Sequence, residues 1–280
     1  MTQLSDPQDS LNKITQSPSY RLAYEDLDFL NSPRLRAARM ELEVLKTELT
    51  LEDYRIQNTI VVFGSTRIVE PAEARRRLEL AQQRLAEQPG NALCQRAVAQ
   101  AERIVAKSGY YDVAREFARL VSQNGYAEGK PHFTVMTGGG PGIMEAANQG
   151  AHDVGAKSVG LNIALPMEQA PNPFITPELC FQFRYFAIRK FHFVLRAMAL
   201  VVLPGGFGTL DELFEVITLR QTGRMQHIPV ILVGREYWNR VIDFAFLADE
   251  GVIADDDLKL FEFVDTAPAA WKIIREFHKL

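Results

Sequence analysis

The stretch Pro204-Gly205-Gly206-Phe207-Gly208-Thr209-Leu210-Asp211-Glu212 joins two segments with different patterns. The apolar run 198–203 before it is typical of a fully buried strand, and residues 213–219 after it place apolar side chains at helical spacing. Glycines at such a junction let backbone N–H groups approach an anion, and the positive end of the helix dipole favours negative charge there. The stretch therefore predicts a phosphate-binding loop, and the carboxylate of Glu212 in the first helical turn points to chemistry.

Short strands and helices alternate along much of the remaining chain. Strands are expected at residues 58–63, 132–136, 157–163, 198–203 and 228–233, and helices near residues 142–154, 186–197, 209–221, 236–248 and 267–279. This alternation predicts right-handed crossovers and a parallel sheet that is covered by helices on both faces. We therefore expect an α/β fold with a Rossmann-like, doubly wound parallel sheet.

Two helical segments are expected in addition to this sheet. Residues 1–57 are predicted to form a helical N-terminal extension, because a Ser-Pro helix start is followed by an apolar stripe at 3- and 4-residue spacing. Residues 58–280 would form the nucleotide-binding catalytic domain, with a helical insertion at about 71–107 that Pro89-Gly90-Asn91 breaks into a hairpin. The run Arg75-Arg76-Arg77 in this insertion is interpreted as a solvated helix face.

Composition argues against several classes of protein. The chain of 280 residues has a formal net charge of −4, so it lacks the basic excess with which a general nucleic-acid-binding protein neutralises phosphates. Its two cysteines, Cys94 and Cys180, lie outside any CxxC motif, which argues against a disulfide framework or a zinc site. No apolar run reaches transmembrane length, and the first residues carry no signal-peptide pattern. We therefore expect a soluble cytoplasmic protein that binds neither nucleic acid nor a membrane.

Ligands of doubly wound sheets bind beyond the carboxyl ends of the strands, at the point where the strand order reverses. If the five strands have the order 3-2-1-4-5, the loops after the first and fourth strands, 64–67 and 204–209, border this point. The loop after the second strand, 137–142, is also rich in glycine and also opens a helix. These loops predict a phosphate-bearing ligand, and the residues expected to bind it are Gly64, Ser65, Gly138, Gly139, Gly140, Gly142, Gly205, Gly206, Phe207, Gly208 and Thr209.

Missing motifs narrow the choice of phosphate ligand. The dinucleotide motif GxGxxG does not follow the first strand, and the P-loop GxxxxGK[ST] is absent, so a mononucleotide fits better. Arg189 and Lys190 lie at the start of another predicted helix, where the dipole disfavours cations, so we expect them to bind the ligand. The planar guanidinium of Arg189 can hold a phosphate or a base edge, whereas Lys190 acts as a point charge.

A carboxylate beside the ribose of a bound nucleotide suits cleavage of the glycosidic bond. An ionised Glu212 would stabilise an oxocarbenium-like transition state and could orient or deprotonate the attacking water. A donor such as Arg189 would then meet the negative charge that develops on the leaving base. An acid in the first turn of a helix is equally explained by its favourable interaction with the helix dipole. Physical reasoning from the residues leaves both interpretations of Glu212 open.

The motifs 204–212 and 138–142, together with Arg189 and Lys190, resemble the Lonely Guy (LOG) family of cytokinin-activating phosphoribohydrolases, formerly called lysine decarboxylases. The resemblance covers about residues 58–250. It implies a Rossmann-like fold, no metal or other cofactor, and at least a homodimer with composite active sites. It also implies hydrolysis of a nucleoside 5′-monophosphate, either AMP or a cytokinin riboside 5′-monophosphate, to free base and ribose 5-phosphate.

The same resemblance implies roles for single residues. Glu212 and Arg189 correspond to the catalytic pair, and Lys190, Thr218 and the residues Gly205, Gly206, Phe207, Gly208 and Thr209 would bind the substrate. Glu168 is a further match near the site. The family's usual Met-His-x-Arg-Lys sequence is reduced here to its basic pair. The N-terminal extension and the helical insertion resemble a longer bacterial branch of the family, which implies AMP nucleosidase-like activity and a higher homo-oligomer.

A second interpretation is a non-catalytic protein on the same fold that binds or carries a nucleotide or the molybdenum cofactor. Carriers that resemble this fold tend to lose the acid and the Arg-Lys pair, and this chain retains Glu212, Arg189 and Lys190. Nothing in the chain marks a lysine that would hold pyridoxal phosphate, so the residues do not support a decarboxylase. We therefore expect an N-glycosidase that uses no cofactor.

Overall fold

The computed structural model describes residues 6–124, 132–166 and 170–280, and the chain divides into two compact units, Met1–Leu49 and Thr50–Leu280. The first unit contains α1 (Pro7–Gln16), η1 (Pro18–Tyr20), α2 (Leu27–Asn31), η2 (Pro33–Leu35) and most of α3 (Arg36–Asp53). Side-chain caps explain where two of these helices begin. The carboxylate of Asp6 accepts a hydrogen bond from the amide of Gln8, and that of Asp26 accepts one from the amide of Phe29.

The described part of the second unit contains a sheet of seven parallel strands in the order β4-β3-β2-β1-β5-β6-β7. The strands are β1 (Asn58–Phe63), β2 (Phe133–Thr137), β3 (Ser158–Ile163), β4 (Cys180–Phe183), β5 (Ala197–Val202), β6 (Val230–Val233) and β7 (Glu262–Val264). The predicted strands are β1, β2, β3, β5 and β6 in the expected order, so the Rossmann-like α/β fold is confirmed. The prediction of five strands was incomplete, because β4 and β7 are edge strands of four and three residues, too short for a clear pattern.

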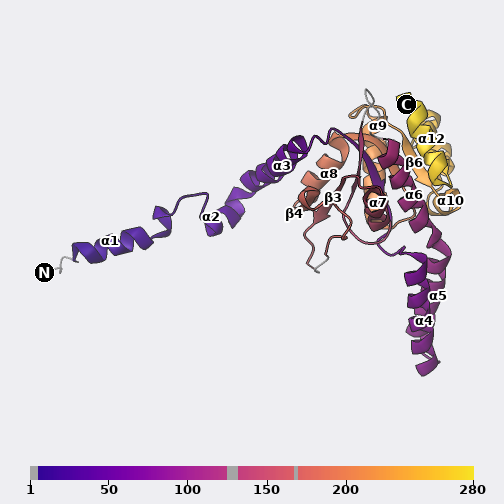
Figure 1. Ribbon diagram of the computed structural model, residues 1–280, viewed down its shortest axis with the longest axis horizontal. Helices are drawn as coiled ribbons and strands as arrows, with labels where there is room; N and C mark the ends of the chain where they lie inside the picture. The colour runs from indigo at the N-terminus through magenta and orange to yellow at the C-terminus, as the bar shows by residue number, and fades with distance from the viewer. Residues whose placement is uncertain (1–5, 125–131, 167–169) are drawn as a thin grey trace. The chain divides into compact units, whose positions relative to one another are not determined.

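The helices of the second unit connect and cover these strands (Figure 1). They are α4 (Pro71–Glu87), α5 (Ala92–Lys107), α6 (Gly109–Asn124), α7 (Ile143–His152), η3 (Pro177–Leu179), α8 (Phe186–Leu195), α9 (Phe207–Gln221), α10 (Arg235–Val241), α11 (Phe244–Asp249), η4 (Asp255–Lys259) and α12 (Ala267–His278). The single helix predicted at 236–248 is wrong. Ile242 is extended with φ −138°, and Asp243 caps a new helix by accepting a hydrogen bond from the amide of Phe246. No helix within the described ranges has the length and apolar character needed to cross a bilayer.

Strand β1 contributes to apolar cores on both faces of the sheet. Ile60 and Val62 belong to a core with residues of α6, α7 and α12. Val61 and Phe63 belong to a second core with residues of α8, α9, α10 and α11. A strand that is buried on both faces needs apolar side chains on both, which explains why residues 60–63 show no alternation. The two cores fix the carboxyl edge of the sheet, where the predicted ligand loops begin.

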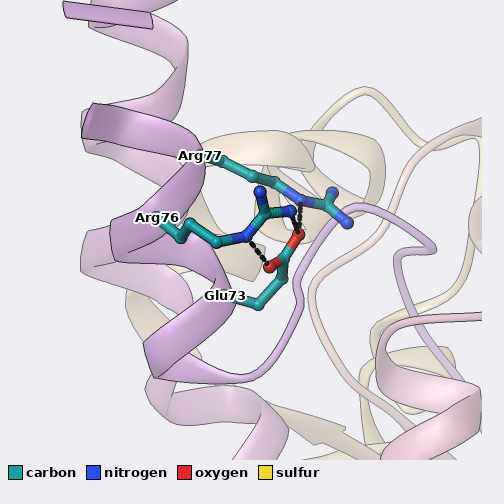
Figure 2. Close-up of polar contacts among 3 residues, drawn as sticks. All are labelled: Glu73, Arg76 and Arg77. Carbon is teal, nitrogen blue, oxygen red and sulfur yellow. Dashed lines mark hydrogen bonds and ion pairs between the residues drawn. The ribbon is translucent and has the colours of Figure 1, made fainter. Parts of the chain in front are cut away.

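The helical insertion consists of α4 and α5, which lie side by side as a hairpin (Figure 1). The three arginines of Arg75-Arg76-Arg77 are exposed on α4, as expected of a solvated face. Figure 2 shows how Glu73 accepts hydrogen bonds from Nε of Arg76 at 2.7 Å and from Nε of Arg77 at 2.6 Å. These bonds, the one from Arg76 first, lower the pKa of Glu73 to about 2. Because these side chains are largely exposed, solvent screens both pairs and they contribute little to the stability of the helix.

Gly150 of α7 sets the distance between α7 and α6. A Cβ atom at this position would lie 2.9 Å from the Cβ of Ala118 and would overlap the carbonyl oxygen of Arg115. We expect Gly150→Ala to force the helices apart and to lower the free energy of unfolding by about 1–3 kcal/mol, measured by urea denaturation.

Gly109→Ala is the matched control, because a Cβ at this first residue of α6 meets no atom within 4 Å. This variant should leave stability unchanged or raise it by up to about 1 kcal/mol. Equal losses of stability in the two variants would contradict the role given to Gly150.

Candidate active site

A cavity of about 570 Å³ opens at the carboxyl ends of β1, β2 and β3, beside the start of α9. This volume is typical of small-molecule sites. The sheet extends from β1 through β2 on one side and through β5 on the other, so the strand order reverses here as expected. The cavity is lined by residues 63–67, Gly138, Gly140, Met144, Asn162, Ile163, Leu165, Phe186, Arg189, residues 206–209, Asp211 and Glu212.

The backbone of Ser65 joins three segments around the cavity. Its N–H donates to the carbonyl of Pro204 at 2.9 Å, and its carbonyl accepts from the N–H of Ile143 at 3.1 Å. The N–H of Leu203 donates to the carbonyl of Phe63 at 2.9 Å and extends the pairing of β1 with β5 to the edge of the cavity. These bonds hold the loop after β1, the loop after β5 and the start of α7 against one another.

Two glycines of the loop after β2 lie in close contact with other segments of the site. Gly142 has a φ of 74°, and a Cβ there would lie 2.5 Å from the carbonyl oxygen of Ser65. A Cβ on Gly138 would lie 2.5 Å from Nη2 of Arg189. The first glycine therefore allows two loops to touch, and the second leaves room for the guanidinium.

A buried polar network holds the same loop. Oδ1 of Asn148, a fully buried residue of α7, accepts hydrogen bonds from the Thr137 hydroxyl at 2.7 Å and from Nδ2 of Asn172 at 2.9 Å. Nδ2 of Asn148 donates to the Ser158 hydroxyl at 3.0 Å, and Nδ2 of Asn172 also donates to the carbonyl of Gly140 at 3.1 Å. The sequence pattern does not reveal this network, because its members come from separate segments and form no motif.

Helix α9 begins at Phe207, two residues before the predicted start, with Gly206 as its N-cap. Its first turn lines the cavity, and Glu212 lies in the second turn and not in the first as predicted. The first N–H groups of a helix have no carbonyl of that helix to pair with, so they can bind an anion. The hydroxyl of Tyr237 donates to the carbonyl of Gly205 at 2.5 Å and so ties the preceding loop to α10. The start of α9 is therefore held in place, and its first N–H groups are oriented so that they could bind an anion.

Glu212 lines the cavity although only 7% of its surface is exposed. Burial raises the pKa of this carboxyl from 4.5 to about 7, and the charges of Lys190 and Arg189 act in the opposite direction. The charges of Glu215 and Asp211 raise the pKa further. A carboxyl with a pKa near 7 gains or loses a proton readily at neutral pH, as a general acid or base requires.

Arg189 of α8 presents its guanidinium to the cavity. Its Nε donates to the carbonyl of Leu161 in β3 at 2.8 Å, and its guanidinium carbon lies 5.3 Å from the centroid of the Phe193 ring. Burial lowers the pKa of Arg189, while the charge of Glu212 raises it, and an arginine stays protonated near pH 7. With Nε bonded to the sheet, the guanidinium has a fixed orientation, and its other N–H groups can serve a ligand.

Charged side chains of both signs line the cavity, namely Arg67, Arg189, Asp211 and Glu212. Across residues 6–124, 132–166 and 170–280, no group of three or more His, Cys, Asp or Glu side chains is placed to hold a metal ion. The chemistry that the lining residues can perform is anion binding, by the guanidiniums and the start of α9, and proton transfer by Glu212.

The cavity brings together most of the predicted site residues. Those that line it are Gly64, Ser65, Gly138, Gly140, Arg189, Gly206, Phe207, Gly208, Thr209 and Glu212. Gly139, Gly142 and Gly205 lie in the same loops without lining the cavity. Thr218 is exposed further along α9, beside a separate shallow hollow, and Glu168 lies outside the described residues.

Lys190 also does not line the cavity. Its Nζ lies 2.8 Å from Oδ2 of Asp211 and 2.9 Å from Oε2 of Glu215, both on α9. The predicted basic pair is therefore divided, with Arg189 toward the cavity and Lys190 toward the acidic side chains of α9.

Several lining residues were not predicted, and four of them, Thr66, Arg67, Asn162 and Asp211, carry polar side chains. Arg67 lies in the loop after β1, and its N–H donates to Oγ of Ser65 at 3.0 Å. Asn162 lies near the carboxyl end of β3, and its Nδ2 donates to Sγ of Cys180 at 3.3 Å. A polar residue at or after the carboxyl end of a strand beside the expected crevice is the signal that indicates both positions.

Comparisons with known proteins identify relatives. A family model described as "Possible lysine decarboxylase" matches residues 144–274. The chain is 32% identical over 180 residues to cytokinin riboside 5′-monophosphate phosphoribohydrolase LOG3 of Arabidopsis thaliana, which covers 62% of this chain and 76% of that protein. LOG4 of the same plant is 31% identical over 180 residues with the same coverage. The X-ray structure of TM1055 is similar over 78% of this chain and 99% of that chain, with 21% identity and a TM-score of 0.46.

The matched segment runs from α7 to α12, so it includes Arg189, the loop 204–206 and Glu212. The resemblance expected from these motifs is confirmed by the relatives. The shared identity over three quarters of the plant proteins' length shows that the chain belongs to the Lonely Guy (LOG) family.

Proposed function

We propose that this protein hydrolyses the N-glycosidic bond of a nucleoside 5′-monophosphate, AMP or a cytokinin riboside 5′-monophosphate, to free base and ribose 5-phosphate. The observation that carries the proposal is the buried carboxyl of Glu212, whose pKa is about 7 and which lies in one cavity with the start of α9. The relatives that are named for this reaction support a nucleotide as the substrate. The expected homodimer or higher homo-oligomer stays a prediction, which the exposed Phe186, Phe191 and Phe207 of α8 and α9 support.

The substrate phosphate would bind at the start of α9. Helix N–H groups and the hydroxyl of Thr209 offer hydrogen bonds, but a dianion beside Asp211 and Glu212 also needs a cation. Arg67 meets this need, because its loop is bonded through Ser65 to the loop that precedes α9. We therefore assign to Arg67 a charge-assisted contact with the phosphate.

The chemistry would take place at C1′ of the ribose. The bond between C1′ and the base nitrogen breaks, water supplies a hydroxyl group to C1′, and the base leaves with a proton. The ionised carboxylate of Glu212 would stabilise the positive charge at C1′ and orient or deprotonate the water. Arg189 would donate to the base as negative charge develops on it. Because Glu212 must be ionised, we infer that activity rises with pH through about 7.

Product analysis tests the reaction directly. The purified protein is incubated with AMP, GMP, CMP, UMP and isopentenyl-AMP, and free base and ribose 5-phosphate are separated by chromatography. We expect both products from AMP or from isopentenyl-AMP, and we expect Glu212→Gln to lower kcat roughly 10²- to 10⁴-fold while it still binds the nucleotide.

Glu79→Gln on the exposed surface of α4 is the control and should keep full activity. If the wild-type protein binds these nucleotides but returns all of them intact, the proposal fails and the carrier interpretation is favoured.

The raised pKa of Glu212 also predicts a stability cost above neutral pH. The folded protein holds a proton on Glu212 up to about pH 7, whereas the unfolded chain releases it near pH 4.5, so folding stability falls as pH rises between these values. The difference between these two pKa values lowers the free energy of unfolding by about 3 kcal/mol at pH values where Glu212 is ionised in both the folded and the unfolded state. Glu212→Gln should therefore raise the melting temperature at pH 8 and have little effect at pH 4. A gain of the same size at both values would contradict the pKa assignment.

Arg67→Gln tests the phosphate contact. We expect KM for the nucleotide to rise by about 10- to 100-fold, because a charge-assisted hydrogen bond is lost, with a smaller change in kcat. Arg75→Gln, which removes an equally exposed charge from α4, should leave KM unchanged. An unchanged KM in Arg67→Gln would show that the phosphate binds elsewhere.

A further inference from the structure

We propose that Lys190 is a positioning residue that acts on Glu212 and does not bind the substrate. The inference deepens the proposed function, and its kinetic test rests on that function. It differs from the substrate-binding role that the family resemblance implies for Lys190. We assign this role to Lys190 because its ammonium group contacts the carboxylates of Asp211 and Glu215, on either side of Glu212 in the sequence.

The ammonium group of Lys190 is held by two acceptors of α9. Its Nζ lies 2.8 Å from Oδ2 of Asp211 and 2.9 Å from Oε2 of Glu215, and 18% of the lysine side chain is exposed. Asp211 and Glu215 are four residues apart, so they share one face of the helix and accept from the same cation. Burial lowers the pKa of Lys190, but its contacts with Asp211 and Glu215, together with the charges of Glu212 and Glu215, leave the pKa above its ordinary value. Two of the three N–H donors of the ammonium group are thus directed at carboxylates, and Lys190 does not line the cavity in which a phosphate would bind.

The charged groups that act on Glu212 come from two neighbouring helices. Burial raises the pKa of Glu212 most, and the opposing effect of Lys190 is larger than that of Arg189, both on α8. Asp211 and Glu215 of α9 raise the pKa further. Arg67, from the loop after β1, is the other charged side chain on the cavity wall. Because Glu212 is buried and Lys190 is largely buried, solvent screens their interaction less than it screens the effect of Asp211, whose side chain is 57% exposed.

Asp211 and Glu215 therefore have two opposite effects. They hold the ammonium of Lys190 near Glu212, and their own charges disfavour ionisation of Glu212. On α8 and α9, Lys190 and Arg189 favour the ionised form of Glu212, and Asp211 and Glu215 disfavour it. If Lys190 were removed, Arg189 would be the one cation of these two helices left to favour ionisation. Loss of the lysine should thus raise the pH at which Glu212 ionises, whereas loss of Glu215 should lower it. A purely structural role of the cluster would not produce shifts of opposite sign.

The first test is titration of Glu212 by carbon-13 NMR of the side-chain carboxyls in the ligand-free protein, with Glu212→Gln to assign the signal. We expect Lys190→Met to raise the midpoint by about one pH unit and Glu215→Gln to lower it. Lys190→Arg keeps the charge and should stay close to the wild type. An unchanged midpoint in Lys190→Met would overturn the proposal, whether or not the protein proves to be a hydrolase.

The second test is kinetic. In the plot of kcat/KM against pH, the rise on the acid side should move to higher pH in Lys190→Met and to lower pH in Glu215→Gln. We call this rise the acid limb. At about pH 9, where Glu212 is ionised in each protein, KM of Lys190→Met should stay within about threefold of the wild type. The opposite result for Lys190→Met would be an acid limb that does not move and a KM at least about tenfold higher than that of the wild type at every pH. That result would mean that Lys190 binds the phosphate and that the proposal is wrong. Absence of hydrolysis by the wild type would contradict the proposed function, and the NMR titration would still decide the role of Lys190.

Discussion

The backbone hydrogen bonds of Ser65 are the constraint on which the rest of the site depends. They join the loop after β1 to the loop after β5 and to the start of α7, at the edge of the sheet where the strand order reverses. Gly142 permits this contact, since a side chain at that position would overlap the carbonyl of Ser65. Because the loops are bonded to one another, the start of α9, Arg67 and the glycine loop after β2 face one cavity.

The cavity combines two opposing requirements at Glu212. Burial removes water from a carboxylate that is to act on a reacting sugar, and the same burial disfavours its ionised form. The cations of α8 offset part of this penalty, and the acidic side chains of α9 hold one of those cations in place. A pKa near 7 is the balance of these effects, so it depends on how α8 packs against α9.

Much of the fold and the place of the cavity could be predicted, because their signals are local. Apolar runs such as 198–203 mark strands buried on both faces, and glycines after them mark loops that approach an anion. The edge strands β4 and β7 escaped prediction because each is short and is defined by pairing with a neighbour. The network around Asn148 escaped it because the network depends on contacts between distant segments. Arg67 was not predicted as a site residue, although it lies in the predicted loop 64–67 after the carboxyl end of β1.

The sequence by itself determined that a basic pair opens one helix of this protein and that an acidic pair lies in the first turns of another. Only the tertiary structure decided which basic residue lines the cavity and which of the two acids on its wall is buried. Neighbouring side chains on an α-helix point about 100° apart, so adjacent residues have different surroundings. Packing of α8 and α9 places Arg189 on the cavity wall and Lys190 against Asp211 and Glu215. The same packing buries Glu212 and leaves Asp211 exposed. Burial raises the pKa of Glu212 to about 7, which suits it to proton transfer, whereas the exposed Asp211 holds Lys190 in an ion pair.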